Sequence, residues 1–231
     1  MSTLGCASKA LNKIRKRISI ASKMVGRCAT DVTIVGASKQ QAAELIRTFH
    51  TAGLENVGEN YLQEALTKRE LLADLDLNWH FIGQVQSNKT RLIAENFSWV
   101  HGVDKLKYAQ RLGAQNPRPT PINLLLQINA DEENSKGGVT FAQAASLSAQ
   151  IAEIQGIRLR GFMLIPKTRQ EQSAQRRVFA KAKELLELSN QQYGLAMETL
   201  SMGMSGDFEA AVMEGSTMIR IGSDLFGRRA Q

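Results

Sequence analysis

The chain has 231 residues, of which 43% are hydrophobic and 22% are charged, and its formal net charge is +7 at pH 7. This composition is ordinary for a globular protein with a sizeable core. Its two cysteines, Cys6 and Cys28, have no metal-ligand spacing and indicate no disulfide framework, so we expect a cytoplasmic protein without a bound metal. No segment is long and apolar enough to span a membrane, and lysines and arginines interrupt the N-terminal region, which excludes a signal peptide.

An amphipathic helix is predicted at about residues 7–26. Its apolar residues recur at steps of three and four, and they are Leu11, Ile14, Ile18, Ala21 and Val25. The simplest interpretation is a helix that covers the core and turns a solvated basic face outward. The alternative is contact with nucleic acid or a membrane surface. No aromatic residues lie among the basic ones, which weakens the nucleic-acid alternative, and we expect neither partner.

Eight short apolar or β-branched runs alternate with helical patterns in the rest of the chain. The strands are predicted at residues 32–39, 54–58, 78–83, 99–103, 122–128, 157–165, 199–204 and 217–221. Such alternation implies a parallel sheet, and eight units fit a closed α/β barrel, a (β/α)8 TIM barrel, as one domain over residues 1–231. An open doubly wound sheet is the alternative. It usually has a glycine-rich first turn, whereas the turn here is Ala37-Ser38-Lys39.

Several residues are predicted to mark the ends of helices. Ser87 and Asp104 can cap the helices that follow the third and fourth strands. Thr140 is expected to open a helix that runs to about residue 155, and Gly53 to end the helix at 40–53.

Lys39 lies at the C-terminal end of the first strand, the edge at which ligands bind in α/β folds. Apolar neighbours can partly desolvate such a lysine, which lowers its pKa and frees a neutral amine for a Schiff base. The alternative is an ordinary solvated lysine at the start of a helix. In a barrel, the same face also carries the other strand ends, at Asn60, His80, Asn129, Met163, Ser201 and Arg220.

The last two units carry a pattern that is typical of phosphate sites. Phosphate sites in barrels are often built from the loops after strands seven and eight. The segment Ser201–Gly206 offers hydroxyls, a flexible backbone and a helix start, and Gly222-Ser223 offers the same features again. The glycines of either segment alone could serve only tight turns, but two such segments in the expected loops favour a phosphate site.

A lysine and a phosphate site on one barrel face suggest pyridoxal 5′-phosphate (PLP), an aldehyde with a phosphate group. Arg220 completes the set, because an arginine at the pyridine nitrogen donates a hydrogen bond and keeps that nitrogen unprotonated. An unprotonated ring is a poor electron sink, so catalysis that relies on the ring would be weak. The alternative role of Arg220 is a structural ion pair at the barrel rim.

The sequence resembles the YggS/PROSC family of pyridoxal phosphate homeostasis proteins, whose barrel is similar to the N-terminal domain of alanine racemase. The segments that carry the resemblance span nearly the whole chain. They are Ala37-Ser38-Lys39, Gly58-Glu59-Asn60-Tyr61, Trp79-His80-Phe81-Ile82-Gly83, Gln86-Ser87-Asn88-Lys89, Gln127-Ile128-Asn129, Glu133-Asn134-Ser135-Lys136, Arg160-Gly161, Leu200-Ser201-Met202-Gly203-Met204-Ser205, Gly215-Ser216-Thr217 and Arg220-Ile221-Gly222.

The resemblance implies a binding protein for PLP, with the cofactor held as an imine on Lys39. It places Ser201, Gly222 and Ser223 at the phosphate and Arg220 at the pyridine nitrogen. We also expect Asn60, at the end of the second strand, to bind the cofactor. It implies a role in cofactor supply, with PLP-dependent apoenzymes as possible partners and no established catalysis. We expect a monomer without catalytic residues.

Three positions depart from the family pattern, namely Gln84, Gly206 and Asp224. Asp224 is the most consequential, because a carboxylate turned toward a bound phosphate would weaken binding. We expect it to face solvent at a helix start.

The alternative function is a PLP-dependent enzyme similar to an amino-acid racemase. Racemisation needs an acid or base on each face of the substrate. Lys39 could serve one face, and Tyr61 and His80 are the internal candidates for the other, although nothing in their spacing selects them.

Overall fold

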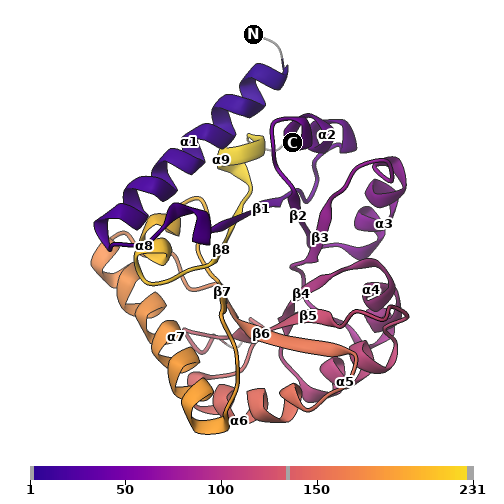
Figure 1. Ribbon diagram of the computed structural model, residues 1–231, viewed down its shortest axis with the longest axis vertical. Helices are drawn as coiled ribbons and strands as arrows, with labels where there is room; N and C mark the ends of the chain where they lie inside the picture. The colour runs from indigo at the N-terminus through magenta and orange to yellow at the C-terminus, as the bar shows by residue number, and fades with distance from the viewer. Residues whose placement is uncertain (1–2, 134–135, 228–231) are drawn as a thin grey trace.

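The predicted strands pair in sequence order, all parallel, and β1 pairs with β8 to close the barrel (Figure 1). The computed structural model describes residues 3–133 and 136–227. Its strands are β1 (Thr33–Ala37), β2 (Asn56–Glu59), β3 (Asn78–Phe81), β4 (Trp99–Val103), β5 (Ile122–Ile128), β6 (Ile157–Leu164), β7 (Thr199–Ser201) and β8 (Met218–Ile221). The prediction of a closed (β/α)8 barrel is therefore confirmed, and the open sheet is wrong.

The helices form a layer around the barrel (Figure 1). They are α1 (Thr3–Met24), α2 (Ala43–Thr51), α3 (Leu62–Leu71), α4 (Thr90–Asn96), α5 (Leu106–Ala114), α6 (Phe141–Ala152), α7 (Gln172–Tyr193), α8 (Phe208–Met213) and α9 (Ser223–Phe226), with short 3₁₀ turns at Ala29–Asp31 and Ser87–Lys89. The main apolar core lies between this layer and the strands, where residues such as Phe81 and Phe97 are fully buried.

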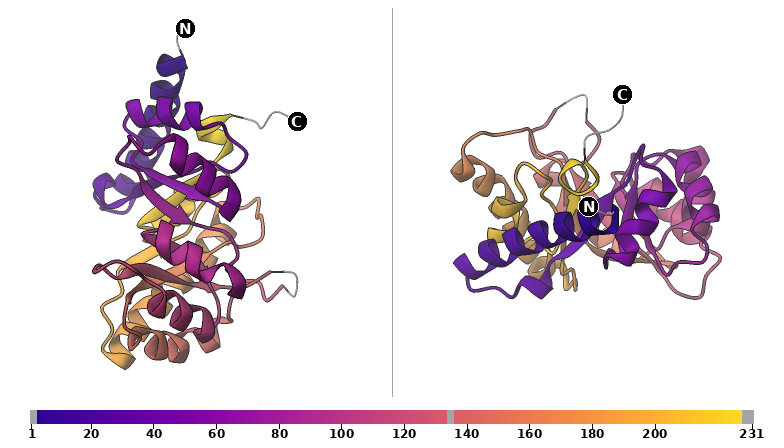
Figure 2. Two further views of the ribbon diagram at one scale, coloured as in Figure 1. Left: turned by 90° about the vertical axis from the view of Figure 1, so that its right-hand side faces the viewer. Right: turned by 90° about the horizontal axis from the view of Figure 1, so that it is seen from above.

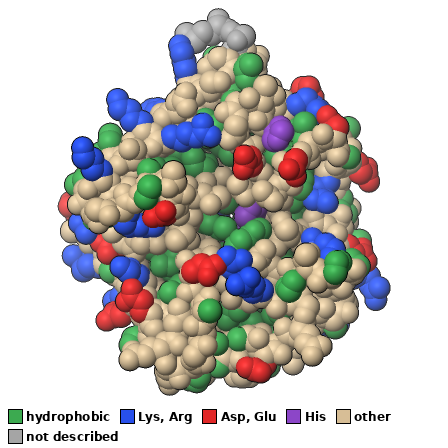
Figure 3. All heavy atoms as spheres, in the orientation of Figure 1, with side chains coloured by type: hydrophobic (Ala, Val, Ile, Leu, Met, Phe, Trp, Pro, Cys, Tyr) green, Lys and Arg blue, Asp and Glu red, His purple; other side chains and the backbone are tan. Residues whose placement is uncertain are grey.

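Helix α1 packs beside α2, α8 and α9 and covers the seam where β1 meets β8 (Figure 1). Its apolar stripe, with Leu11, Ile14 and Ile18, is buried as predicted. The helix begins earlier than expected, at Thr3. It also ends earlier, at Met24, because Gly26 adopts a φ of 68° and turns the chain. Basic side chains gather on the outer edge of the molecule along α1 (Figure 3).

The predicted helix boundaries are partly right. Thr140 caps α6 in a capping box with Gln143, and Gly53 ends the α2 region with a φ of 95°. The caps at Ser87 and Asp104 are wrong. Ser87 begins a 3₁₀ turn instead and its carbonyl accepts a hydrogen bond from Thr90. Asp104 accepts one from the Gly138 amide at 3.3 Å, in the loop after the neighbouring strand β5.

Candidate functional site

The C-terminal ends of the strands form one face of the molecule. The loops after β5 and β6 and helix α9 project from the barrel on the same side (Figure 2). Lys39 lies on this face, two residues after Ala37, which is the last residue of β1. Lys39 therefore continues the same side of the alternating strand pattern as Ala37. Its side chain is half-buried, and no described residue forms a hydrogen bond or ion pair with its ammonium group. The Lys39 amine is therefore available to a ligand at the barrel mouth.

A buried network beneath the loop fixes the peptides on both sides of Lys39. Lys68, on α3, donates to the Ser38 carbonyl, to Glu59 Oε1 and to Glu64 Oε1, each at 2.6 Å. Glu64 Oε1 also accepts from the Gln40 amide at 2.5 Å. The backbone before and after Lys39 is thus hydrogen-bonded to one cluster of charged side chains.

Glu59 is the most deeply buried member of this cluster. Its side chain is fully buried at the end of β2 and accepts a hydrogen bond from Ser38 Oγ at 2.5 Å. Burial raises the pKa of the Glu59 carboxyl above its ordinary value, although hydrogen bonds from Lys68 and Ser38 oppose the shift. The ion pair with Lys68 is what makes a carboxylate tolerable at this position.

Sequence analysis did not identify this cluster. One signal was present, because Lys68 follows Leu62 and Ala65 at steps of three along the buried stripe of α3. A lysine on an apolar helix face needs a buried partner, and Glu59 at a strand end was a candidate.

Arg220 and Ser201 lie inside the barrel. Arg220 is 4% exposed and donates from Nη1 to the carbonyl and hydroxyl oxygens of Ser201, both at 2.6 Å, and from Nη2 to the Leu164 carbonyl at 2.7 Å. Burial lowers the pKa of Arg220 to about 10, and nearby Asp207 opposes the shift. Arg220 therefore stays cationic at neutral pH. The Ser201 hydroxyl faces Arg220 and His101 rather than Ser223.

The loops after β7 and β8 meet at two serines. Ser223 Oγ and Ser205 Oγ lie 3.4 Å apart, and Ser223 is exposed. A Cβ atom built on Gly222 would lie 3.5 Å from the Ala37 carbonyl oxygen, so these loops border the end of β1 and the Lys39 turn. The helices that follow are short, with six residues in α8 and four in α9. The backbone and hydroxyl groups of the loops are thus the main donors available to an anion.

Asp224 is held by α1. Arg17 pairs with Asp224 at 2.7 Å and with Glu209 at 2.5 Å, and its guanidinium carbon lies 4.2 Å from the centre of the Phe208 ring. Asp224 is exposed, as expected, but its charge is matched by Arg17. One residue of the N-terminal helix therefore ties together the helices that follow both serine loops.

Other predicted residues occupy different parts of this face. Asn60 is half-buried, and its carbonyl oxygen leaves no room for a side chain at Gly83, where a Cβ atom would lie only 2.1 Å away. Asn129 donates to the Glu133 carbonyl at 2.8 Å, which shapes the loop after β5. Met163 is buried, and Tyr61 is 56% exposed.

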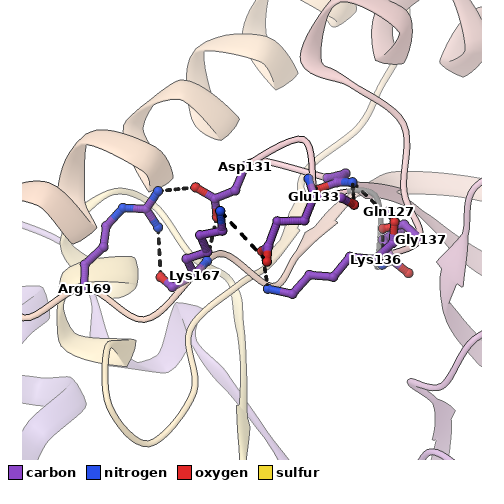
Figure 4. Close-up of polar contacts among 8 residues, drawn as sticks. Gln127, Asp131, Glu133, Lys136, Gly137, Lys167 and Arg169 are labelled. Carbon is purple, nitrogen blue, oxygen red and sulfur yellow. Dashed lines mark hydrogen bonds and ion pairs between the residues drawn. The ribbon is translucent and has the colours of Figure 1, made fainter.

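Charged side chains join the loops after β5 and β6 (Figure 4). Asp131 pairs with Arg169 and accepts from the Lys167 amide at 2.6 Å, while Glu133 pairs with Lys136 at 2.7 Å. These contacts join the two loops into one rim of the barrel mouth, on the side formed by β5 and β6. Asn134 and Ser135, which belong to one of the segments that carry the resemblance, lie outside the described residues.

Two of the departures from the family pattern lie on the surface. Gln84 is exposed near Gly137, and Gly206 is exposed with open space around it. Within residues 3–133 and 136–227, no group of three or more His, Cys, Asp or Glu side chains is arranged to hold a metal ion, and no helix is long and apolar enough to cross a membrane.

Comparisons with known proteins show which family the chain resembles over nearly its whole length. The profile of the alanine racemase N-terminal domain matches residues 10–230. The pyridoxal phosphate homeostasis protein of Pseudomonas aeruginosa is 49% identical over 218 residues, which are 94% of this chain and 93% of the relative. The protein of the same name from Escherichia coli K12 is 42% identical over 223 residues, 95% of each chain.

Solved structures show the same fold. PipY of Synechococcus elongatus, determined with PLP bound, superposes with a TM-score of 0.84 at 33% identity and covers 96% of this chain and 100% of its own. Alanine racemase of Clostridium difficile superposes with a TM-score of 0.72 at 15% identity. This chain covers 57% of that enzyme, so the likeness concerns the barrel fold alone.

Proposed function

Because the chain belongs to the family of pyridoxal phosphate homeostasis proteins, we propose that it binds PLP at the barrel mouth and acts in intracellular PLP supply rather than in catalysis. The observation that carries the proposal is the available Lys39 amine after β1, a strand that pairs with the strand of Arg220 and borders the serine loops. The exposed free thiols of Cys6 and Cys28 support a reducing compartment such as the cytoplasm.

The residues present fit three groups of PLP, namely the aldehyde, the phosphate and the ring nitrogen. Lys39 would bond to the aldehyde carbon as a Schiff base, with the carbonyl oxygen leaving as water. Gly222 and Ser223 would contact the phosphate. Arg220 has five N–H groups, of which three are used within the barrel, so two remain to donate to the ring nitrogen. We assign Ser201 to the ring side of the site, beneath Arg220, instead of to the phosphate.

Bound PLP supplies a reactive aldehyde and a ring that can accept electrons. In this chain, Arg220 would keep the ring nitrogen unprotonated, which weakens the ring as an electron sink. Neither candidate for a second acid or base is well placed, because His80 is fully buried in a hydrogen-bonded network and Tyr61 points to solvent. These features support a binding protein over a racemase-like enzyme.

The position of the phosphate can be tested with one charged substitution. Ser223→Glu places a carboxylate beside the phosphate, so we expect PLP to bind at least about tenfold more weakly, since charge-assisted phosphate contacts are worth about 1–3 kcal/mol. Ser223→Gln has the same size without the charge and should bind PLP much better than the Glu variant. The measurement is a spectroscopic titration of all three proteins with PLP and with pyridoxal, which lacks the phosphate.

Pyridoxal should bind the wild-type protein poorly and should be almost unaffected by Ser223→Glu. If the Glu variant weakens both ligands equally, the phosphate does not lie at this loop. If the wild-type protein turns over alanine or serine and Lys39→Ala does not, the racemase-like alternative replaces the present proposal.

Arg17 should support the phosphate loops indirectly. Arg17→Met leaves the carboxylates of Asp224 and Glu209 without their partner, and Asp224 adjoins Ser223. We expect PLP affinity to fall about two- to fivefold, because the pairs are partly exposed and each contributes up to about 1 kcal/mol. The double variant Arg17→Met with Asp224→Asn should recover most of the affinity in the same titration. A double variant that binds no better than Arg17→Met would show that the charge of Asp224 is not the cause.

The partners follow from the same proposal. We propose that PLP-dependent apoenzymes receive the cofactor from this protein. We also propose that the working form is a monomer.

A further inference from the structure

A chain of hydrogen bonds crosses the barrel interior from Arg220 to Asn56. Arg220 donates to Ser201 Oγ at 2.6 Å, and Ser201 Oγ lies 2.9 Å from His101 Nδ1. His101 Nε2 lies 3.0 Å from His80 Nδ1, and His80 Nε2 lies 3.0 Å from Asn56 Oδ1. The five residues come from β8, β7, β4, β3 and β2, so the chain connects strands on opposite sides of the barrel.

The direction of this chain follows from the donors and acceptors. The Ser201 hydroxyl oxygen already accepts from Arg220, and its own hydrogen has one available acceptor among the described residues, His101 Nδ1. His101 must then carry its hydrogen on Nε2 and donate to His80 Nδ1. His80 in turn carries its hydrogen on Nε2 and donates to Asn56 Oδ1. The reverse direction would leave the buried Ser201 hydrogen without a partner, which is costly.

We propose that Ser201 and His101 are positioning residues that hold the Arg220 guanidinium in place for the PLP ring, through a chain of one-way hydrogen bonds that ends at Asn56. This inference rests on the proposed function, because it assigns a purpose to Arg220 at that site. The hydroxyl of Ser201 can accept from Arg220 in a fixed direction only while its hydrogen is directed to His101. His101 is fixed in turn by His80 and Asn56.

Among the described residues that form the chain, Arg220 is the only cation. Burial lowers the pKa of His80 to about 3. Burial, together with the proximity of His80 and Arg220, lowers the pKa of His101 well below its ordinary value. Both imidazoles are therefore neutral at physiological pH, as the one-way chain requires, because each ring must offer one nitrogen as an acceptor.

The direction of the chain can be measured without the cofactor. Nitrogen chemical shifts from NMR distinguish a neutral imidazole with its hydrogen on Nε2 from one with its hydrogen on Nδ1. We expect His80 and His101 of the apoprotein to be neutral at pH 7 with their hydrogens on Nε2. A hydrogen on Nδ1 of either ring, or a charged ring, would overturn the inference whatever the protein does with PLP.

Two substitutions of His101 separate positioning from packing. The amide of asparagine occupies the place of imidazole Nδ1, so His101→Asn keeps an acceptor for Ser201, whereas glutamine reaches the place of Nε2, so His101→Gln loses that acceptor. We expect His101→Gln to weaken PLP binding about tenfold. It should also shift the absorption spectrum of bound PLP in the same direction as Arg220→Ala, which we expect to shift that spectrum because it removes the donor to the ring nitrogen. His101→Asn should weaken binding at least threefold less and shift the spectrum less.

Ser201→Ala provides a second route to the same result if a histidine variant does not fold. It removes the hydroxyl between Arg220 and His101, and the bound PLP should show the spectral shift of His101→Gln. Equal weakening by His101→Asn and His101→Gln, or an unchanged spectrum in Ser201→Ala, would overturn the inference while PLP binding by the wild-type protein still stands. Failure of the wild-type protein to bind PLP would overturn both the inference and the proposed function.

Discussion

Replacement of Lys39 by alanine is expected to abolish covalent attachment of PLP. The wild-type protein mixed with PLP should develop a visible absorption band, and borohydride should then fix the cofactor to the peptide that contains Lys39. Lys39→Ala should show neither. The fold should be retained, because the half-buried Lys39 side chain has no hydrogen bond or ion pair to a described residue.

Lys167→Ala is a suitable control for this experiment. Lys167 belongs to the rim on the other side of the mouth, where its ammonium lies 4.0 Å from Glu133, and it has no assigned contact with PLP. The control should keep the visible band and the labelled Lys39 peptide. Label on a different lysine of the wild-type protein would move the site, and a retained band in Lys39→Ala would show that the amine is not required.

Replacement of Lys68 by methionine is expected to have the largest effect on stability. The substitution leaves the fully buried Glu59 carboxylate without its ion-pair partner, at a cost of about 3–5 kcal/mol in the free energy of unfolding. The same change releases the Ser38 carbonyl, so the Lys39 loop should also become less well fixed. Urea denaturation of the variant and the wild-type protein measures the first effect, and PLP titration measures the second.

The effect of Lys68→Met should depend on pH. Burial already raises the folded-state pKa of Glu59, and loss of Lys68 raises it further. A carboxyl whose pKa is higher in the folded than in the unfolded state binds its proton more tightly when the chain is folded, so acid favours folding. This contribution to stability is complete below the unfolded-state pKa of about 4.3 and is lost as the pH rises through the folded-state pKa. The variant should therefore be least destabilised in acid and most destabilised above the raised pKa.

A double variant supplies the control. Lys68→Met with Glu59→Gln removes both charges, so it should be more stable than Lys68→Met alone at neutral pH and should lose the added pH dependence. An equal loss of stability at pH 4 and pH 8 in the single variant would show that Glu59 ionisation is not the cause.

The barrel could be predicted from the sequence because its signals are local and repeated. Each strand is a short apolar run, and the order of strands around a closed parallel barrel follows the order in the chain. Lys39 and Arg220 could be selected as site candidates because each is a charged residue that adjoins or lies within a predicted strand. The structure brings their strands together, because β1 pairs with β8.

The interior of the site could not be predicted in the same way. His101 and Ser201 lie 100 positions apart in the chain, and nothing local to either one indicates that they meet. Ser201 illustrates the limit, because a serine in a glycine-rich loop is typical of a phosphate site, whereas its side-chain direction depends on whether strand alternation turns it inward. The helix caps at Ser87 and Asp104 failed for a related reason, because contacts in the folded chain compete with local capping.

The pairing of β1 with β8 has a consequence for the order in which the molecule is made. Lys39 belongs to the first strand and Arg220 to the last, so a ribosome completes the amine of the site long before it completes the arginine and the phosphate loops. A partly synthesised chain thus has the lysine proposed to form the Schiff base without the other residues proposed for the site. Capture of PLP would await closure of the barrel, and PLP at 100 times its dissociation constant would then stabilise the closed form by about 2.7 kcal/mol.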